Sequence, residues 1–560
     1  MTKSAPAPIR IALSTADCRP LDRQGIQAPG AARLRLRDGE GRVYAEITGS
    51  TGEVAVGGSL GIHLVTAEDA EGRVLATASF RVETRTAIRD GAGTAKRLLE
   101  LLSDTMFNDW HKGYEKGLRI DGKFYRYYVS WIRDHVHSLK GMKYFDHDRV
   151  GIQSGIELYA DSQREDGMIW DKCKKMLHSD LQNWRDHEFA EGDFIRKIPG
   201  HPQRRWQRIP VENDVEYLFV EGLYYSWKAT GDDAWMERYL DHCLRAVRYG
   251  TSDRYRWSQK HQLLKRGYTI DTWDFQHKED VAISGSAMRV DPDKTRFNVF
   301  YGDNTGMAMS CRYLAEMLSV AGREAEAAEM AALADGIQQR LDALAWNGRF
   351  YRHMVGEDPS VRRDVGGTDE AEQVTQSNAY SLNRGIDHAK AVAIIDRYQA
   401  IKDEMPVSSA GEFYACYPPF EKGFGHNDWN YMNGGVTTIC GGELARGAFV
   451  HGREAYGADL LARLCGWAER LGGYLHCCLK GAITDRDPGT CRSLSLDGRA
   501  TVALDARSPG GLPTWGEDAN DLRTLPVGDQ RFLDLPFRVG DSTAAGGKAA
   551  VRLRDNEVLS

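Results

Sequence analysis

The sequence predicts a mainly α-helical protein, in which antiparallel helical hairpins close into a ring behind a small N-terminal β-domain. Residues 30 to 86 alternate between apolar and polar side chains, as strands do. From about residue 90 the apolar period changes to about 3.6 residues, as in helices that bury one face. The predicted helices come in pairs, with irregular spacing and no sequence repeat, which favours a closed ring over an open solenoid.

The elements can be assigned in chain order. Runs at 33–37, 62–65 and 78–82 are the clearest strands of a β-sandwich-like domain over residues 1–88. Three helix pairs then stand out because each is joined by a short turn with a glycine: 212–229 with 232–250, 303–320 with 323–344, and 434–450 with 453–472. The ring is expected over residues 89–480. Runs at 494–504, 537–539 and 550–553 predict strands in a C-terminal extension over 481–560.

Composition and charge exclude several classes of protein. Hydrophobic residues make up 42% of the 560 and charged residues 27%, which suits a folded chain of two or three units. The net charge is −7 without a basic block, so we expect neither nucleic acid nor a membrane as partner. The first residues lack the apolar core of a secretory signal, which predicts a cytoplasmic protein. The ten cysteines form no CxxC pair, so we expect reduced thiols, no metal site and no cofactor. Nothing in these patterns specifies an oligomeric state.

Polar and aromatic side chains gather in the long irregular stretches expected at 165–210, 252–300, 345–372 and 404–433. Loops of this length are usually functional. Carboxylates and guanidinium groups among indole rings suit a sugar site, because each sugar hydroxyl both donates and accepts while the ring face packs on aromatics. The candidate substrate-binding residues in the first half of the chain are Trp131, Arg133, Asp134, Trp184, Arg205 and Asp214. Their alternative interpretation is structural: a helix-start ion pair beside a core tryptophan, and a helix cap at Asp214.

Two further clusters carry carboxylates that could act in catalysis. Asp271 and Asp274 flank Trp273 in a non-helical segment, and burial beside the indole would raise a carboxyl pKa as a general acid requires. Two turn-capping aspartates remain the alternative. The stretch 411–435 is rich in aromatics and glycines, and its candidates are Glu412, Glu421, Trp429 and Asn433. A flap that only covers the core is the alternative there.

The order of these motifs resembles glycoside hydrolases built on an (α/α)6 toroid. The group includes trehalases, mannosyl-oligosaccharide glucosidases and plant neutral invertases, with glycogen-debranching glucosidases as cousins. The resemblance spans about 95–475 and lies in the runs 131–134, 166–169, 271–275, 411–414, 423–425 and 433–436. It implies that Asp274 is the general acid and Glu412 the general base. Glu421 and Glu443 compete with Glu412 for the second role.

The resemblance implies an exo-acting, inverting α-glycosidase for an oligosaccharide or small glycoside, and this chemistry needs no metal. The residues themselves specify neither the sugar nor the anomer nor the linkage. An inverting enzyme uses one carboxylic acid on the leaving oxygen and one carboxylate that activates water on the other face. Other activities of the same toroid remain open: a polysaccharide lyase, which would need a tyrosine or histidine base, and a sugar epimerase with paired histidines. A non-catalytic glycan-binding protein is a further alternative.

Overall fold

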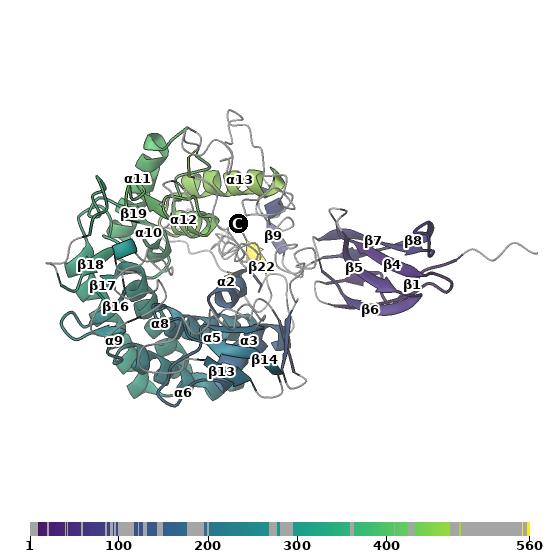
Figure 1. Cartoon of the computed structure of the whole chain (residues 1–560), viewed down its shortest axis with the longest axis horizontal. Helices are drawn as coiled ribbons and strands as arrows, with labels where there is room; N and C mark the ends of the chain where they lie inside the picture. The colour runs from purple at the N-terminus through teal and green to yellow at the C-terminus, as the bar shows by residue number, and fades with distance from the viewer. Residues whose placement is uncertain are drawn as a thin grey trace, which may run out of the picture.

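The computed structural model describes most of the chain between residues 9 and 482, together with two short strands near the C-terminus. The described residues are 9–19, 22–39, 41, 43–57, 60–83, 87–89, 93–94, 97–98, 117–120, 123–126, 132–142, 149–175, 195–198, 201–267, 277–279, 290, 295–358, 363–407, 409–423, 429, 432–470, 481–482, 551–552 and 557–559. Figure 1 shows a ring of helices with the N-terminal β-domain at one side.

The N-terminal strands form two antiparallel-rich sheets around their own core. The larger sheet has the order β2 (Asp17–Cys18), β8 (Val74–Val82), β7 (Gly61–Glu68), β4 (Arg33–Arg37) and β5 (Val43–Thr48). The smaller sheet has the order β1 (Ala12–Leu13), β3 (Arg23–Gln27) and β6 (Thr51–Ala55). Leu34 and Leu36 of β4 are fully buried between arginines that point outward, so the alternation predicted for this segment is confirmed. Leu60 packs against both this core and the core of the ring.

The ring is built from helical hairpins in two layers. Figure 1 shows α2 (Ile132–Met142), α5 (Val215–Thr230), α8 (Tyr301–Val320), α10 (Ser377–Ser381) and α12 (Thr438–Val450) around the inside. Their partners are α3 (Arg149–Asp161), α6 (Asp233–Gly250), α9 (Glu324–Ala345), α11 (His388–Glu404) and α13 (Glu454–Arg470). Each inner helix contacts the next inner helix along the chain. The three helix pairs predicted from the sequence are therefore confirmed.

Glycine fixes the turn in each of those three pairs. Gly231, Gly322 and Gly452 have φ values of 63°, 74° and 80°. This left-handed conformation is unfavourable for residues that carry a Cβ atom, so a glycine directly after a helix stops it and lets the chain reverse. The glycines seen in the sequence thus mark the ends of α5, α8 and α12.

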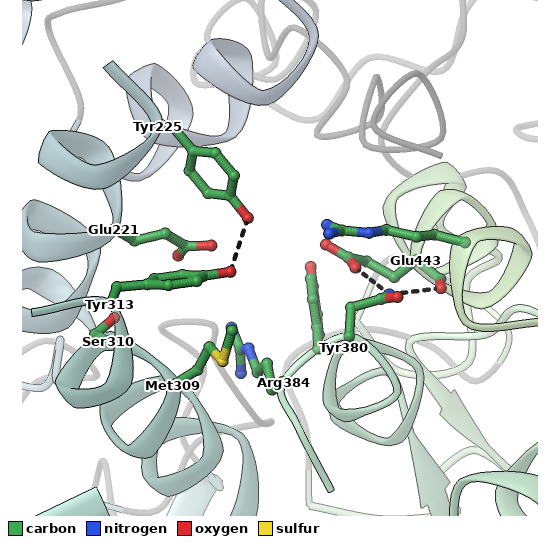
Figure 2. A pocket seen from close by; sticks show the side chains of 11 residues that line it. Glu221, Tyr225, Met309, Ser310, Tyr313, Tyr380, Arg384 and Glu443 are labelled. Carbon is green, nitrogen blue, oxygen red and sulfur yellow. Dashed lines mark hydrogen bonds between the residues drawn. The ribbon is translucent and has the colours of Figure 1, made fainter. Parts of the chain in front are cut away.

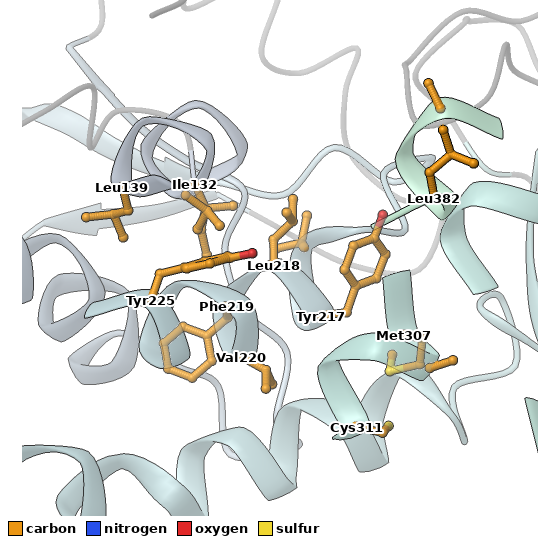
Figure 3. Close-up of a cluster of buried hydrophobic side chains, with 14 of the residues drawn as sticks. Ile132, Leu139, Tyr217, Leu218, Phe219, Val220, Tyr225, Met307, Cys311 and Leu382 are labelled. Carbon is orange, nitrogen blue, oxygen red and sulfur yellow. The ribbon is translucent and has the colours of Figure 1, made fainter. Parts of the chain in front are cut away.

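A continuous core lies between the two layers of the ring. Figure 3 shows part of it, where side chains of α2, α5 and α8 interdigitate, among them Ile132, Leu218 and Met307. The inner helix α5 is buried along almost its whole length, because α2, α3, α6 and α8 all pack against it. At Gly306 of α8, an added Cβ atom would lie 2.5 Å from the ring of Tyr217, so the close approach of α8 to α5 depends on this glycine.

Small sheets occupy stretches for which the sequence indicated only irregular structure. The strands β12 (Lys172–Lys175), β14 (His201–Gln207) and β13 (Ile195–Ile198) form one sheet. A second sheet joins β15 (Trp257–Ser258), β16 (Leu263–Gly267), β17 (Phe297–Phe300) and β18 (Met354–Gly356). The expectation of irregular structure was wrong at these strands. The strands β12, β17 and β18 pair with strands that lie far away in the chain, and short runs such as 201–207 carry no clear alternation.

Three shorter strand pairings complete the described structure. They are β10 (Gly117–Ile120) with β11 (Lys123–Arg126), β19 (Val374–Thr375) with β20 (Cys416–Tyr417), and β9 (Ala87–Arg89) with β22 (Glu557–Leu559) and β21 (Val551–Arg552). The strand predicted at 550–553 is therefore present. The runs predicted at 494–504 and 537–539 lie outside the described residues.

Candidate functional site

Polar side chains follow one face of the inner helix α5. Asp214, Tyr217, Glu221 and Tyr225 are spaced three, four and four residues apart, so they share one side of the helix. Asp214, Tyr217 and Glu221 are buried, although each carries a polar or ionisable group. Buried polar groups need partners: Asp214 accepts from Arg133 of α2, and the Tyr225 hydroxyl lies 3.3 Å from the hydroxyl of Tyr313 in α8. The stripe therefore leads from the start of α5 into the interior of the ring.

The start of α5 carries an ion-pair cluster around Arg133 of α2. The Arg133 guanidinium donates to both oxygens of Asp214, at 2.6 and 2.8 Å, and to both oxygens of Glu212, one of them at 3.3 Å. Burial disfavours its charge, but the two carboxylates outweigh burial and raise the pKa of Arg133. In the same way, Arg133 overcomes the burial of Asp214 and lowers its pKa. The structure thus brings together two residues that the sequence indicated separately, Arg133 and Asp214.

Two buried arginines support this cluster from behind. Arg208 donates to both oxygens of Glu216, at 3.1 and 3.0 Å, and to the Glu212 carbonyl at 2.9 Å. Arg256 donates to the same carbonyl at 2.6 Å. Because a bidentate contact fixes both position and angle, these bonds hold the backbone that carries Glu212.

Tyr217 connects the cluster with the interior of the ring. Burial raises its pKa first of all, and Asp214 and Asp303 raise it further, whereas Arg384 lowers it. The Arg384 guanidinium lies 5.7 Å from the Tyr217 ring centre and donates to the Gly302 carbonyl at 2.9 Å. The charged groups at the helix starts and those deeper in the ring therefore belong to one continuous polar region.

A pocket lies inside the ring, next to Tyr217. Its empty space is about 270 Å³ when the part open to solvent is counted. Figure 2 shows Glu221, Tyr225 and Tyr313 on one side and Glu443 on the other, with the two carboxylates directed toward the space between them. Four inner helices or their ends supply the lining: Glu221, Tyr225, Gly306, Met309, Ser310, Tyr313, Tyr380, Asn383, Arg384, Glu443 and Arg446.

The pocket is polar and tied together by hydrogen bonds. Asn383 donates from Nδ2 to Oε2 of Glu443 at 2.6 Å, and the hydroxyls of Tyr225 and Tyr313 lie 3.3 Å apart. Burial disfavours the charge of Arg446, but Tyr225 and Glu443 keep its pKa raised. Two carboxylates and two guanidinium groups thus belong to the lining of the pocket. A lining with this many donors and acceptors suits a ligand with several hydroxyl groups.

Glu412 lies away from this pocket. Its carboxylate accepts a hydrogen bond from the Tyr456 hydroxyl at 2.5 Å and a bidentate contact from Arg463 at 2.7 and 2.8 Å. Both partners belong to the outer helix α13, and the Glu412 side chain is fully buried. These contacts bind the Glu412 carboxylate to α13, and its role as general base remains a prediction.

Three other candidates from the stretch 411–435 are also described. Glu421 is exposed and accepts from the Gly367 backbone amide at 2.9 Å. Asn433 is buried and exchanges two hydrogen bonds with the Phe420 backbone, at 2.6 and 2.9 Å. Trp429 is half-buried against Tyr414 and Tyr417. The structure does not place these side chains in the lining of the pocket.

Of the remaining candidates, two lie in described elements and five lie outside the described residues. Asp134 lies in α2 and Arg205 in β14. Trp131, Trp184, Asp271, Trp273 and Asp274 lie outside the described residues. Their roles remain predictions.

Sequence reasoning missed Glu221, Arg384 and Arg446 as pocket residues. A signal for the first was present, because the spacing of Asp214, Tyr217, Glu221 and Tyr225 places polar groups where an inner helix should be apolar. Arg384 follows the short helix α10, and Arg446 lies in α12, whose other charged residue is Glu443. For these two, the sequence alone offers no comparable pattern.

Asp171, beside the Arg133 cluster, is a buried carboxyl whose Oδ2 accepts from the Ile209 amide at 2.6 Å. Its Oδ1 has no hydrogen-bond partner among the described residues. Burial raises its pKa from 3.8 to about 6, although Lys172 and Arg208 oppose this shift. Between about pH 4 and pH 6 the folded state therefore binds more protons than the unfolded state, and stability falls as the pH rises.

We expect Asp171→Asn to remove this pH dependence. Relative to the wild type, the free energy of unfolding of the variant should improve by up to about 3 kcal/mol between pH 4 and pH 6, since one pKa unit corresponds to about 1.4 kcal/mol. Urea unfolding at several pH values measures the difference, with Asp335→Asn as an exposed control. A difference between variant and wild type that does not change with pH would contradict the shift.

Among the described residues, no group of three or more histidine, cysteine, aspartate or glutamate side chains is arranged to hold a metal ion. Within the same part of the chain, no helix combines the length and apolar character needed to span a membrane.

The chain is only distantly similar to proteins of known structure. No protein-family model matches the sequence, and no curated protein matches it. Among solved structures, the chain is similar to a GH63 mannosylglycerate hydrolase from Thermus thermophilus in complex with glucose, with a TM-score of 0.46 and 13% identity over 79% of this chain and 99% of that chain. It is also similar to a rhamnosidase from Klebsiella oxytoca with rhamnose bound, with a TM-score of 0.39 and 11% identity over 79% of this chain and 78% of that chain. At these values the matches assign neither a family nor an activity to the chain.

Proposed function

We propose that this protein is a glycoside hydrolase that binds one end of a glycoside inside the ring. The observation that carries the proposal is the pocket in which Glu221 and Glu443 face each other, with Arg384 and Arg446 also in the lining. Inverting hydrolysis needs a carboxylate that activates water on one face of the sugar, and a glutamate in this lining can fill that role. Hydroxyl-rich ligands also need many donors and acceptors, which this lining supplies.

The proposed fold is a complete (α/α)6 toroid, with domain boundaries at 88/89 and 480/481. Five hairpins of such a ring lie in the described part of the chain. Residues 97 and 98 support a sixth, because Leu98 is buried in the ring core and Arg97 pairs with Glu469 of α13 at 3.3 Å. Segments from the two ends of the ring therefore meet, as closure requires.

The proposed general base is Glu443. Of the three glutamates that competed for this role, Glu412 is bound to α13 and Glu421 is exposed, whereas Glu443 lines the pocket. In an inverting reaction, Glu443 takes a proton from water as the water oxygen attacks the anomeric carbon. The general acid gives its proton to the glycosidic oxygen on the other face as the carbon–oxygen bond breaks. We retain Asp274 as this acid on the basis of the resemblance, with Glu221 binding sugar hydroxyls.

Exo action is proposed from the resemblance, and stacked tyrosines form one wall of the pocket. Tyr313 stacks on Tyr224 with ring centres 3.8 Å apart, and its hydroxyl lies 3.3 Å from that of Tyr225. Behind them, the Tyr224 hydroxyl donates to the exposed Glu316 at 2.9 Å. A pocket bounded in this way accommodates the end of a chain better than its middle.

A polysaccharide lyase is the second candidate. Tyr225, Tyr313 and Tyr380 offer phenols, and Arg384 and Arg446 could neutralise a uronate carboxylate. A lyase would create an unsaturated product that absorbs ultraviolet light, whereas a hydrolase would not. An epimerase is less well supported, because the histidine pair His388 and His451 lies outside the pocket, with His388 exposed.

The experiment that tests the proposed function is a screen of the purified chain against aryl glycosides and disaccharides of both anomers. We expect hydrolysis of at least one substrate without ultraviolet-absorbing product. NMR of the first-formed sugar should show inverted anomeric configuration. Retained configuration would contradict the inverting mechanism, and a lack of any cleavage would contradict the proposed function.

Asp274→Asn tests the acid. We expect a loss of about 10²–10⁴-fold in kcat on a natural disaccharide, the usual contribution of general acid catalysis. The loss should be smaller on an activated aryl glycoside, because a good leaving group needs less protonation. Steady-state kinetics on both substrates measure the difference. Equal activity of variant and wild type on the disaccharide would move the acid to Glu221.

A further inference from the structure

Asn383 links the end of α10 to Glu443 of α12. Its Nδ2 donates to the Glu443 carboxylate at 2.6 Å and to the Glu443 backbone carbonyl at 2.8 Å. Both partners are acceptors, so turning the amide over would bring its oxygen against two oxygens. The network therefore fixes which side of the amide faces Glu443.

The other side of the amide is an acceptor that is not used. Oδ1 of Asn383 is buried and has no hydrogen-bond partner among the described residues, and Asn383 lines the pocket. Most buried polar atoms in proteins are hydrogen-bonded, so an unused acceptor in the lining of a pocket suits a donor from a bound ligand. A sugar hydroxyl is such a donor.

We propose that Asn383 has two tasks in the hydrolysis proposed above: it positions the base Glu443 through Nδ2, and it binds a hydroxyl of the substrate through Oδ1. The two tasks are coupled, because a single rigid amide makes both contacts. A substrate that bonds to Oδ1 holds the amide in place, and the amide holds the carboxylate. The inference depends on the proposed function, since it presupposes that Glu443 is the base.

Asn383→Asp tests the first task. The variant replaces the amide donor with a second carboxyl group beside Glu443, and two carboxyls that share a site resist double ionisation. The acidic limb of the pH profile of kcat/KM should therefore move up by about one pH unit or more. Asn347→Asp adds the same charge at an exposed turn and should leave the limb in place.

Deoxy substrates test the second task. For one monodeoxy derivative of the hydrolysed aryl glycoside, wild-type kcat/KM should fall by about 3–10-fold, as for loss of one neutral hydrogen bond. In Asn383→Ala the same derivative should cause no further loss, because its partner is already gone. Urea unfolding midpoints of the variants check that they are folded.

The outcomes separate this inference from the proposed function. If the wild type cleaves no glycoside, the proposed function fails. If the wild type is active but the acidic limb of the kcat/KM profile does not move in Asn383→Asp, Asn383 does not position the base. If every deoxy derivative loses the same factor in Asn383→Ala as in the wild type, Asn383 binds no substrate hydroxyl.

Discussion

Glu443→Gln is expected to lower kcat by about 10²–10⁴-fold on every substrate, including those with excellent leaving groups. The reason is that water needs activation however good the leaving group is. Glutamine keeps the shape and can still accept the hydrogen bond from Asn383, so the fold should remain intact. Steady-state kinetics with an aryl glycoside measure the loss.

The matched control is Glu329→Gln, an exposed glutamate of the outer helix α9 that pairs with Arg248 at 3.4 Å. It should retain wild-type kcat. If Glu443→Gln were as active as this control, Glu443 would not be the base. A binding protein without catalysis would hydrolyse nothing in either form, while still retaining a sugar ligand.

Glu412→Ala is expected to destabilise the protein by about 1.5–3 kcal/mol, because it removes the bidentate contact of Arg463, which keeps Asp459 as its second carboxylate. Removing both charges together, in Glu412→Leu with Arg463→Leu, should recover part of this loss, since apolar side chains can replace a buried ion pair. Urea or thermal unfolding measures stability, and activity is measured per folded molecule. The folded fraction should hydrolyse at close to the wild-type rate.

A second variant at position 412 tests whether Glu412 or Glu443 is the general base. If Glu412 were the base, the folded fraction of Glu412→Gln would be inactive, whatever the stability of the variant. That result, with an active Glu443→Gln variant, would restore the assignment implied by the resemblance. Tyr456→Phe is a milder test of the structural role of Glu412, because it removes only one hydrogen bond to the Glu412 carboxylate.

Helical hairpins and strands could be predicted because their signals are local. The glycines at 231, 322 and 452 end helices through their own backbone conformation, whatever surrounds them. Leu34 and Leu36 alternate with arginines along β4, and that period alone assigns them to the inner face. The sequence could also point to the polar cluster at the start of α5, where Arg133 and Asp214 meet.

Only the tertiary structure decides which carboxylates face the pocket. Glu412 lies in an irregular segment without a period, and its direction depends on Arg463, which is 51 residues away in the chain. Glu443 faces inward because α12 is packed against α10 and α13, which fixes how the helix is turned. Local propensity determines where a helix begins and ends, but the rotation of that helix in the ring depends on packing with neighbours that the sequence does not identify.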